Sequence, residues 1–176
     1  MRFDVGCDLS EFRRYYRNSG IYEYLKSVGL TDGYDENLDY MMNVVIKDPS
    51  QLIVWRQNKK IVGHAVWHES NTEEHRKGDP REKEDTKALR KLLGGKKNFV
   101  ELHEIWLTEG YRGKGYGDMF HDFFEELMKA KGYSDIVFYA YHPAAVAICH
   151  KHGYKEAGYL KGLKEYVFYL PLKKNP

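Results

Sequence analysis

The clearest hydrophobic pattern along the chain lies between residues 100 and 131. Its first part, Val100 to Leu107, is an apolar run interrupted by Glu101, His103 and Glu104, which predicts a strand. After a glycine-rich turn, apolar residues recur with helical spacing while charged residues fill the other positions. The apolar positions are Met119, Phe120, Phe123, Phe124, Leu127 and Met128. The pattern therefore predicts a strand, a turn and a helix whose buried face fixes its N-terminus.

The remaining apolar patterns predict further helices and strands in a mixed α/β arrangement. Helices are expected within residues 8–47, with breaks at Ser19-Gly20 and Asp32-Gly33, and from Ala144 to His152. Strands are expected at Leu52–Trp55, Ile61–Trp67, Ile136–Tyr141, Tyr154–Leu160 and Leu163–Leu170. His64 and His68 share one face of the second of these strands. We expect that face to be half-exposed, the alternative being that both histidines line a pocket.

The composition changes abruptly in residues 69–98, which are rich in charged side chains. Apolar side chains able to pack are confined to Ala88, Leu89, Leu92 and Leu93, on a short helix expected from about Arg81. The segment is longer than a hairpin connection should be. We interpret it as a mobile, solvated insertion between two strands, with a lid over a cleft as the alternative.

Length and charge restrict the class of protein. The 176 residues predict a single domain, 1–176, that includes the insertion, and residues 173–176 are expected to form a tail. The formal net charge of +2 argues against a nucleic-acid partner. No apolar run approaches the ~20 residues that a membrane span needs, and the two cysteines do not suggest a disulfide framework. We expect a soluble, cytoplasmic protein without a membrane partner, and a homodimer is compatible with the sequence.

The turn from Arg112 to Gly117 has the features of an anion-binding loop. Glycines allow close backbone approach, and the following helix presents unpaired N–H groups and a partial positive charge. The spacing G-x-G-x-G fits neither the Walker A loop nor the G-x-G-x-x-G dinucleotide fingerprint. A pyrophosphate is the group that such a cradle suits.

Two motifs together carry a resemblance to a known family. Arg112, Gly115 and Gly117 match the pattern [RQ]-x-x-G-x-G, and residues 142–154 are similar to N-x-x-A-x-x-x-Y-x-x-x-G-[FY]. Over residues 51–170 the chain resembles the GNAT-type, acetyl-CoA-dependent N-acetyltransferases. The resemblance implies their α/β fold: a twisted, mixed but mostly antiparallel sheet with helices on both faces and a splay between two central parallel strands.

The resemblance also implies acetyl-CoA as co-substrate, with no metal. It places the pantetheine arm against the backbone of Trp106, Leu107 and Thr108. It places the pyrophosphate on the loop Arg112, Gly113, Lys114, Gly115, Tyr116 and Gly117. His142 stands where the family has an asparagine that bonds the pantetheine.

Acetyl transfer to an amine requires a base, because an alkylamine is almost entirely protonated at neutral pH. Glu101 and His103 project from one face of the predicted strand and Glu104 from the other. By resemblance, His103 is the candidate base, with Glu101 as its partner or its replacement. Glu104 is a candidate anchor for the substrate amine.

Cys149 stands where the family has its general-acid tyrosine. A thiol could protonate the departing thiolate, but Cys149 could equally be a small buried residue, with Tyr141 or Tyr154 as the acid. A metal site formed by Cys149, His150 and His152 is unfavourable, because these residues point from more than one face of a helix.

The sequence thus predicts an N-acetyltransferase that acts on a small-molecule amine or a peptide amino group. The alternative is a non-catalytic acyl-CoA-binding or regulatory domain that retained the glycine loop but lost the general acid.

Overall fold

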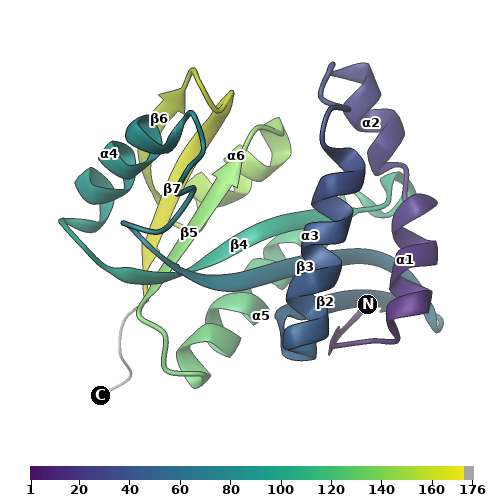
Figure 1. Cartoon of the computed structure of the whole chain (residues 1–176). Coiled ribbons are helices and arrows are strands. Elements are labelled where there is room, and N and C mark those ends of the chain that lie inside the picture. Colours follow the sequence, from purple (N-terminus) through teal and green to yellow (C-terminus); the bar gives the residue numbers. More distant parts are fainter. Residues whose placement is uncertain (173–176) are drawn as a thin grey trace. The chain divides into compact units, whose positions relative to one another are not determined.

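The computed structural model describes residues 1–172 (Figure 1). The strands are β1 Arg2–Val5, β2 Leu52–Gln57, β3 Lys60–Asn71, β4 Asn98–Leu107, β5 Asp135–Ala140, β6 Lys155–Leu160 and β7 Glu165–Pro171. The helices are α1 Leu9–Arg17, α2 Ile21–Ser27, α3 Tyr34–Lys47, α4 Glu82–Leu93, α5 Tyr116–Ala130 and α6 Pro143–Lys151, with short 3-10 helices η1 Pro49–Gln51 and η2 Glu109–Tyr111. Residues 173–176, predicted to be a tail, lie outside the described residues.

The strands form one seven-stranded mixed sheet within the described residues, in the order β1-β2-β3-β4-β5-β7-β6. The β1–β2, β2–β3, β5–β7 and β6–β7 pairs are antiparallel, and β4 pairs with β5 in parallel. The β4–β5 register joins Val100–Leu102 to Ile136–Phe138, whereas β4 itself runs on to Leu107. The predicted mixed α/β fold is confirmed, and the short parallel register is consistent with a splay.

Two compact units make up the described chain, and each is considered by itself. The first contains Met1–Trp67 and Glu104–Gly117. The predicted helix breaks are confirmed, since α2 and α3 each begin after a glycine with positive φ, Gly20 (83°) and Gly33 (86°). Strand β1 was not predicted, because four residues at the edge of a sheet carry too little periodicity to be recognised.

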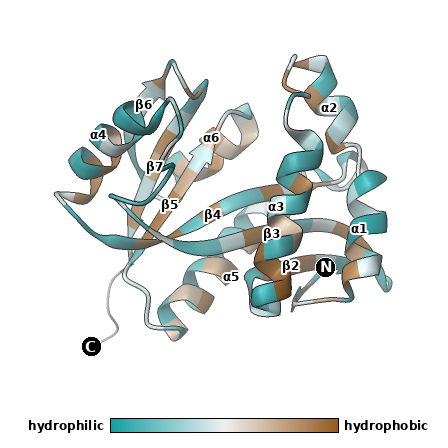
Figure 2. Ribbon diagram, in the orientation of Figure 1, coloured by the Kyte–Doolittle hydropathy of each residue, from teal (hydrophilic) through white to brown (hydrophobic). Residues whose placement is uncertain are grey.

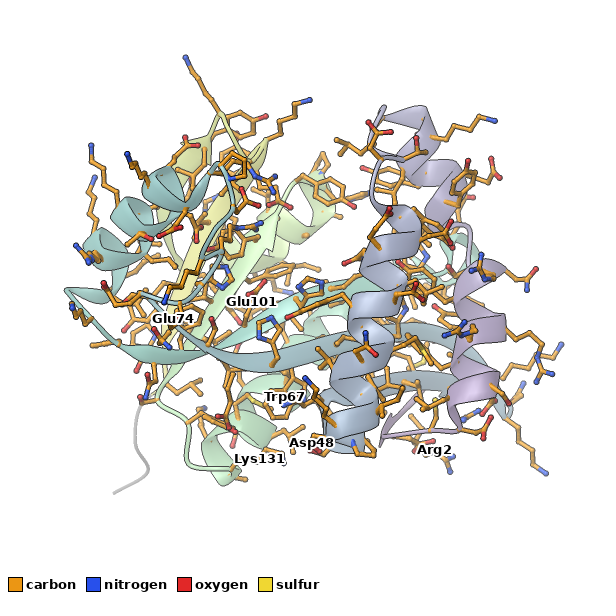
Figure 3. All side chains as sticks on the ribbon, viewed as in Figure 1. Arg2, Asp48, Trp67, Glu74, Glu101 and Lys131 are labelled. Atoms are coloured by element: carbon orange, nitrogen blue, oxygen red, sulfur yellow. The ribbon has the colours of Figure 1, made fainter. Side chains whose placement is uncertain are left out.

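The hydrophobic core of the first unit lies between its helices and strands. Its fully buried side chains include Phe12, Leu38, Met41, Val45, Leu52, Val54 and Val66. Strands β2 and β3 form a hairpin that turns at Asn58 and Lys59, both with positive φ as a tight two-residue connection requires. Trp67 is also buried, and its indole Nε1 donates a hydrogen bond to the Ser50 carbonyl oxygen at 3.1 Å (Figure 3).

The second unit contains His68–His103 and the described residues from Asp118 onward. Strand β5 is buried along its whole length, as its apolar run predicted, and is drawn largely in the hydrophobic colour in Figure 2. Helix α5 buries Phe120, Phe124 and Met128, whereas Met119 is 48% exposed. The buried face is therefore rotated slightly from the predicted one, and it includes His121.

The insertion, residues 69–98, is packed into the second unit, so the expectation of a solvated segment is wrong. Helix α4 begins at Glu82, close to the expected start, and buries Leu89 and Leu93 in a cluster with Phe99 and Val167. The helix lies against β6 and β7 (Figure 1). One apolar stripe on a mostly charged helix is sufficient to dock it, which the high average polarity of the segment concealed.

None of the helices in residues 1–172 has the length and apolar character that crossing a bilayer requires.

Candidate active site

The polar residues of β4 divide into two sets, as the alternation of a strand predicts. His103 Nδ1 lies 3.4 Å from Glu101 Oε1, which confirms that these two side chains share a face. Glu104 makes a different set of contacts, with residues of the first unit. The strand thus carries two separate carboxylate centres.

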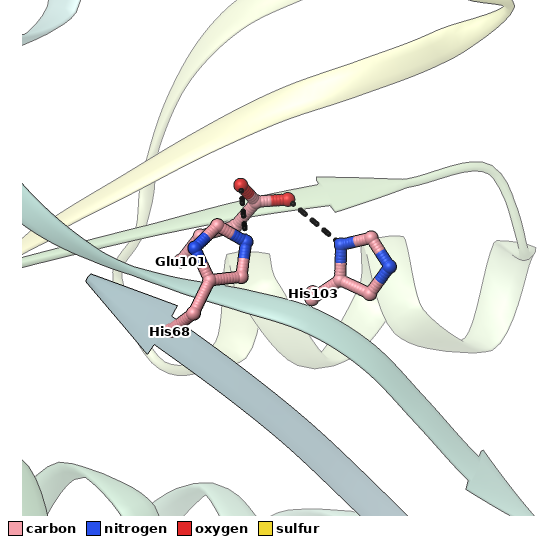
Figure 4. A group of neighbouring side chains, drawn as sticks. All are labelled: His68, Glu101 and His103. Carbon is pink, nitrogen blue, oxygen red and sulfur yellow. Dashed lines mark ion pairs between the residues drawn. The ribbon is translucent and has the colours of Figure 1, made fainter. Parts of the chain in front are cut away.

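The first centre is the carboxylate of Glu101, which is buried and surrounded by three imidazoles. Besides His103, His68 Nε2 and His75 Nδ1 each lie 3.2 Å from Glu101 Oε2. Figure 4 shows His68 and His103 converging on the carboxylate from two neighbouring strands. Sequence analysis did not place His68 beside Glu101, because their proximity depends on how β3 aligns with β4. We refer to His68, His75, Glu101 and His103 as the histidine–glutamate cluster.

Charge in this cluster is set by competition between burial and ion pairing. Burial favours the neutral form of Glu101, but the imidazoles of His103 and His68 outweigh it and hold the pKa of the carboxyl well below its usual range. Burial also favours neutral His68, but the Glu101 carboxylate prevails and raises the pKa of His68. For His75 burial prevails and lowers the pKa, against the attraction of Glu101 and Asp85. Glu101 is therefore an anion at neutral pH.

A second layer of polar groups supports His75. Its ring stacks on Tyr139 with centroids 5.4 Å apart, and the Tyr139 hydroxyl donates a hydrogen bond to Asp85 Oδ1 at 2.5 Å. Asp85 is fully buried on α4, and burial raises its pKa. The Arg76 guanidinium lies 4.9 Å above the Tyr139 ring. The sequence signal for His75 and Asp85 is a His and an Asp close to the apolar face of the helix in the insertion. The many charged residues around them favour the interpretation that they are exposed to solvent.

The second centre is Glu104, held by donors of the first unit. His64 Nε2 lies 2.7 Å from Glu104 Oε1, and Asn37 Nδ2 donates to Oε2 at 2.9 Å. The Tyr16 hydroxyl lies 3.3 Å from the same Oε2. His64 is fully buried, so the expectation of a half-exposed position is wrong for this residue. The reason is that His64 finds a carboxylate partner on β4, which offsets the cost of its burial.

The loop after β4 has the backbone geometry of an anion cradle. Gly113 and Gly115 have positive φ values of 71° and 76°, and a Cβ added to either would meet no atom within 4 Å. Helix α5 begins immediately afterwards at Tyr116, so its first-turn N–H groups have no helical acceptor. An accessible glycine loop at a helix start fits the pyrophosphate of coenzyme A.

The two basic residues of the loop are bound to the chain itself. Arg112 Nε donates to the Leu107 carbonyl oxygen at 2.7 Å, and its guanidinium lies 4.3 Å above the Trp106 ring. Lys114 Nζ donates to the Gly110 carbonyl oxygen at 3.0 Å. Arg112 therefore fastens the loop to the end of β4 and contributes its charge from that position.

The end of β4 modifies the expected contacts to the pantetheine arm. The Thr108 N–H donates to the Val62 carbonyl oxygen of β3 at 2.9 Å, and the Trp106 carbonyl lies beside Gly63 of the same strand. Since successive residues of a strand direct their peptide groups to opposite sides, Leu107 directs its own away from β3. The Thr108 N–H and the Trp106 carbonyl are thus directed toward β3, whereas the Leu107 N–H is directed to the other side and the Leu107 carbonyl oxygen accepts from Arg112 Nε.

The residues of the second motif lie on or next to α6. His142 is the N-cap, and its Nδ1 accepts a hydrogen bond from the Ala144 N–H at 3.1 Å. Cys149 is fully buried, and burial raises the pKa of its thiol well above the usual range. This favours the alternative of a small buried residue. His150 and His152 contact different acidic residues, Glu156 and Glu125, as expected for side chains that diverge around a helix.

A hollow of about 500 Å³ lies in the first unit. It is lined by Arg17, Asn18, Gly20, Tyr22, Glu23, Tyr34 and Asp35. Tyr34 stacks on Tyr16, the ring that contacts Glu104. The hollow has aromatic and acidic walls, which suit a cationic or aromatic amine, but it contains no candidate base.

Comparisons with known proteins agree with this geometry. The family model described as "Acetyltransferase (GNAT) family" matches residues 12–154. No curated protein matches the sequence.

Among solved structures, a putative arylalkylamine N-acetyltransferase 7 from the mosquito Aedes aegypti is similar, with a TM-score of 0.74 and 12% identity. The similarity covers 96% of this chain and 86% of that one. PaiA N-acetyltransferase from Thermoplasma acidophilum, solved with coenzyme A, has a TM-score of 0.64 at 16% identity and covers 97% and 98% of the two chains. A Drosophila melanogaster polyamine N-acetyltransferase has a TM-score of 0.60 at 12% identity, over 77% and 80%. At such low identity these structures are evidence for the fold alone.

Proposed function

The chain belongs to the GNAT family of acetyltransferases, and we propose that it transfers the acetyl group of acetyl-CoA to the amino group of an acceptor. The observation that carries this proposal is the contact between Glu101 and His103 on β4, the strand that leads into the glycine loop. An ionised carboxylate beside an imidazole is an arrangement suited to general-base chemistry.

In the proposed mechanism, His103 accepts the proton of the acceptor ammonium, directly or through water. A proton on His103 Nδ1, the nitrogen that faces Glu101, leaves the lone pair on Nε2. Glu101 then stabilises the imidazolium that forms, as the negative charge of a nearby carboxylate should. Glu101 is thus the positioning residue and His103 the proton acceptor.

The glycine loop and the end of β4 have the role of binding the co-substrate. Acetyl-CoA, when bound, supplies the acetyl thioester. Gly113, Gly115 and the first turn of α5 would hold its pyrophosphate, and the Leu107 N–H would bond the pantetheine arm. His142 caps α6 with Nδ1, so its contribution to the pantetheine would come from its other ring nitrogen.

Burial supports a choice among the candidate proton donors for the departing thiolate. Cys149 is fully buried and Tyr154 nearly so, and burial raises the pKa of both groups. Tyr141 is half-buried and directly follows β5. We therefore propose Tyr141 as the proton donor, and Glu104 as an anchor for the acceptor amine within the first unit.

The acceptor is proposed to be a small amine. The similar structures include enzymes named for arylalkylamines and for polyamines. The acidic and aromatic hollow around Tyr22 and Asp35 supports the same class of acceptor.

A panel of amines tests the proposal against its main alternative, a domain that binds acyl-CoA without turnover. Release of free coenzyme A thiol is measured with polyamines, arylalkylamines, amino acids and peptide N-termini, and binding of acetyl-CoA is measured separately. We expect saturable, acceptor-dependent thiol release with at least one small amine. Tight acetyl-CoA binding without turnover on any acceptor would favour the alternative.

Gly117→Val should raise the KM for acetyl-CoA about tenfold or more. The added side chain would obstruct close approach to the first turn of α5, and losing hydrogen bonds to a charged group costs ~1.5–3 kcal/mol each. The measurement is KM for acetyl-CoA together with a thermal unfolding curve. Gly110→Ala is the matched control, since a Cβ there meets no atom within 4 Å and its φ is not positive. An unchanged KM in a folded Gly117→Val protein would refute the loop assignment.

A further inference from the structure

The histidine–glutamate cluster contains a set of side chains with the composition of a metal site. One ligand atom from each of His68, Glu101 and His103 lies within 4.8 Å of the others. Glu101 and His103 stand at alternate positions of β4, and His68 comes from β3 (Figure 4). All three are therefore carried by strand backbone, which holds them more firmly than a loop would.

We propose that His68, Glu101 and His103 form a binding site for a divalent transition-metal ion of the Zn²⁺ type. Two imidazoles and one carboxylate are ligands that such ions prefer, and a site with three protein ligands leaves a fourth position for water or an anion. The proposal concerns binding, and it does not require the chain to be an acetyltransferase.

The distances within the set are close to those that an ion would impose. Nitrogen and oxygen ligands at 2.0–2.1 Å from a tetrahedral ion are separated from each other by about 3.4 Å. Glu101 lies 3.2 Å from His68 Nε2 through Oε2 and 3.4 Å from His103 Nδ1 through Oε1. These two contacts use different oxygens of the carboxylate, and one ligand atom from each of the three residues lies within 4.8 Å of the others, so closing the set by roughly an ångström or a little more, through small side-chain rotations, would complete the geometry.

An independent observation concerns Glu101 Oε2. The Glu101 side chain is only 5% exposed, yet Oε2 accepts no hydrogen bond of acceptable geometry. The nearest imidazole nitrogens, His68 Nε2 and His75 Nδ1, each lie 3.2 Å from this oxygen. A buried carboxylate oxygen without a hydrogen bond is costly, and a cation bound between Glu101 and the imidazoles would satisfy it.

The residues around the set would support an ion. The second carboxylate nearby, Asp85, faces His75 Nε2 at 3.7 Å and adds negative charge. His75 Nδ1 lies 3.1 Å from the Ser70 hydroxyl and 3.2 Å from Glu101 Oε2, so Ser70 and Asp85 hold the His75 ring beside the carboxylate. Carboxylates and rings that orient the ligands are a regular feature of metal sites.

An ion in this site has a consequence that rests on the proposed function. Coordination through His103 Nδ1 would leave the proton of the ring on Nε2, the atom proposed to accept the proton of the amine. A bound ion would therefore inhibit acetyl transfer reversibly, and a chelator would restore it.

Binding is tested on the untagged, full-length protein after treatment with a chelator and dialysis. Titration with Co²⁺ is followed by visible absorption, and Zn²⁺ binding is followed by calorimetry and by displacement of Co²⁺. We expect one ion per chain and a Tm that rises with Zn²⁺ concentration, because an ion that binds the folded state stabilises it. The absence of saturable one-to-one binding of either ion would overturn the proposal.

Substitutions of the proposed metal ligands test where the ion binds. His68→Gln should lower the affinity for Zn²⁺ and Co²⁺ at least about tenfold. Loss of a residue that only orients a ligand already lowers metal affinity 10–100-fold. His150→Gln is the matched control, since the His150 side chain is 54% exposed and pairs with Glu156. His103→Gln provides a second ligand variant in case His68→Gln does not fold.

Wild-type affinity in both folded ligand variants would refute the site, as would a loss confined to His150→Gln. These binding results are independent of thiol release. A chain that binds one Zn²⁺ but acetylates no amine would therefore contradict the proposed function alone.

Discussion

His103→Ala is expected to lower kcat by about 10²–10⁴-fold on the best acceptor, the usual cost of losing a general base. His103 is the imidazole that contacts Glu101 Oε1, at 3.4 Å on the same face of β4. The KM for acetyl-CoA should stay near the wild-type value, because the glycine loop and Leu107 are unchanged. The measurement is steady-state kinetics with both substrates varied, on protein dialysed against a chelator so that no bound ion contributes.

Comparison with Glu101→Gln separates proton transfer from positioning. This variant keeps the shape of the side chain but removes the anion that faces His103, so kcat should fall by less than in His103→Ala. Added imidazole should partly restore the kcat of His103→Ala and should not restore the kcat of Glu101→Gln. A wild-type kcat in His103→Ala would disprove the role of His103, and Glu101 would then be the candidate base. His150→Ala is the control for histidine loss at an exposed position.

The second large effect expected concerns acid stability and His121. This side chain is 1% exposed on α5, and its Nδ1 lies 3.4 Å from the Tyr154 hydroxyl. Burial, with a contribution from the charge of His152 and against that of Asp118, lowers the pKa of His121 from 6.5 to about 3. Between these two values the unfolded chain binds more protons than the folded chain, so stability rises with pH. The contribution of His121 is complete above pH 6.5 and is lost as pH falls toward 3.

His121→Gln removes this titration and keeps a polar group beside Tyr154. At pH 5 the wild-type protein should have lost about 2 kcal/mol of its free energy of unfolding through His121, since one pH unit corresponds to ~1.4 kcal/mol. The difference in stability between pH 7 and pH 5 should shrink by about that amount in the variant. Urea unfolding at the two pH values measures it, with His150→Gln as the control. An unchanged difference would show that His121 is protonated in the folded chain.

The sequence alone determined the central unit of the fold. The apolar alternation of β4, the positive-φ glycines Gly113 and Gly115, and the helical period of α5 are local properties. Local properties can be recognised because neighbouring residues alone create them. The same alternation placed Glu101 and His103 on one face and Glu104 on the other, as the contacts confirm.

The tertiary structure decided which distant side chains meet these residues. His68 and His75 reach Glu101, and His64 reaches Glu104, through the alignment of β3 with β4 and the folding of residues 69–98. No local period encodes such an alignment, so these residues were interpreted as solvated or half-exposed. The complete burial of Cys149 is likewise a result of the tertiary structure, because the sequence gives the position of a thiol on a helix but not what covers it. The histidine–glutamate cluster, for which catalysis and metal binding are proposed, is therefore a property of the fold, whereas the glycine loop is a property of the sequence.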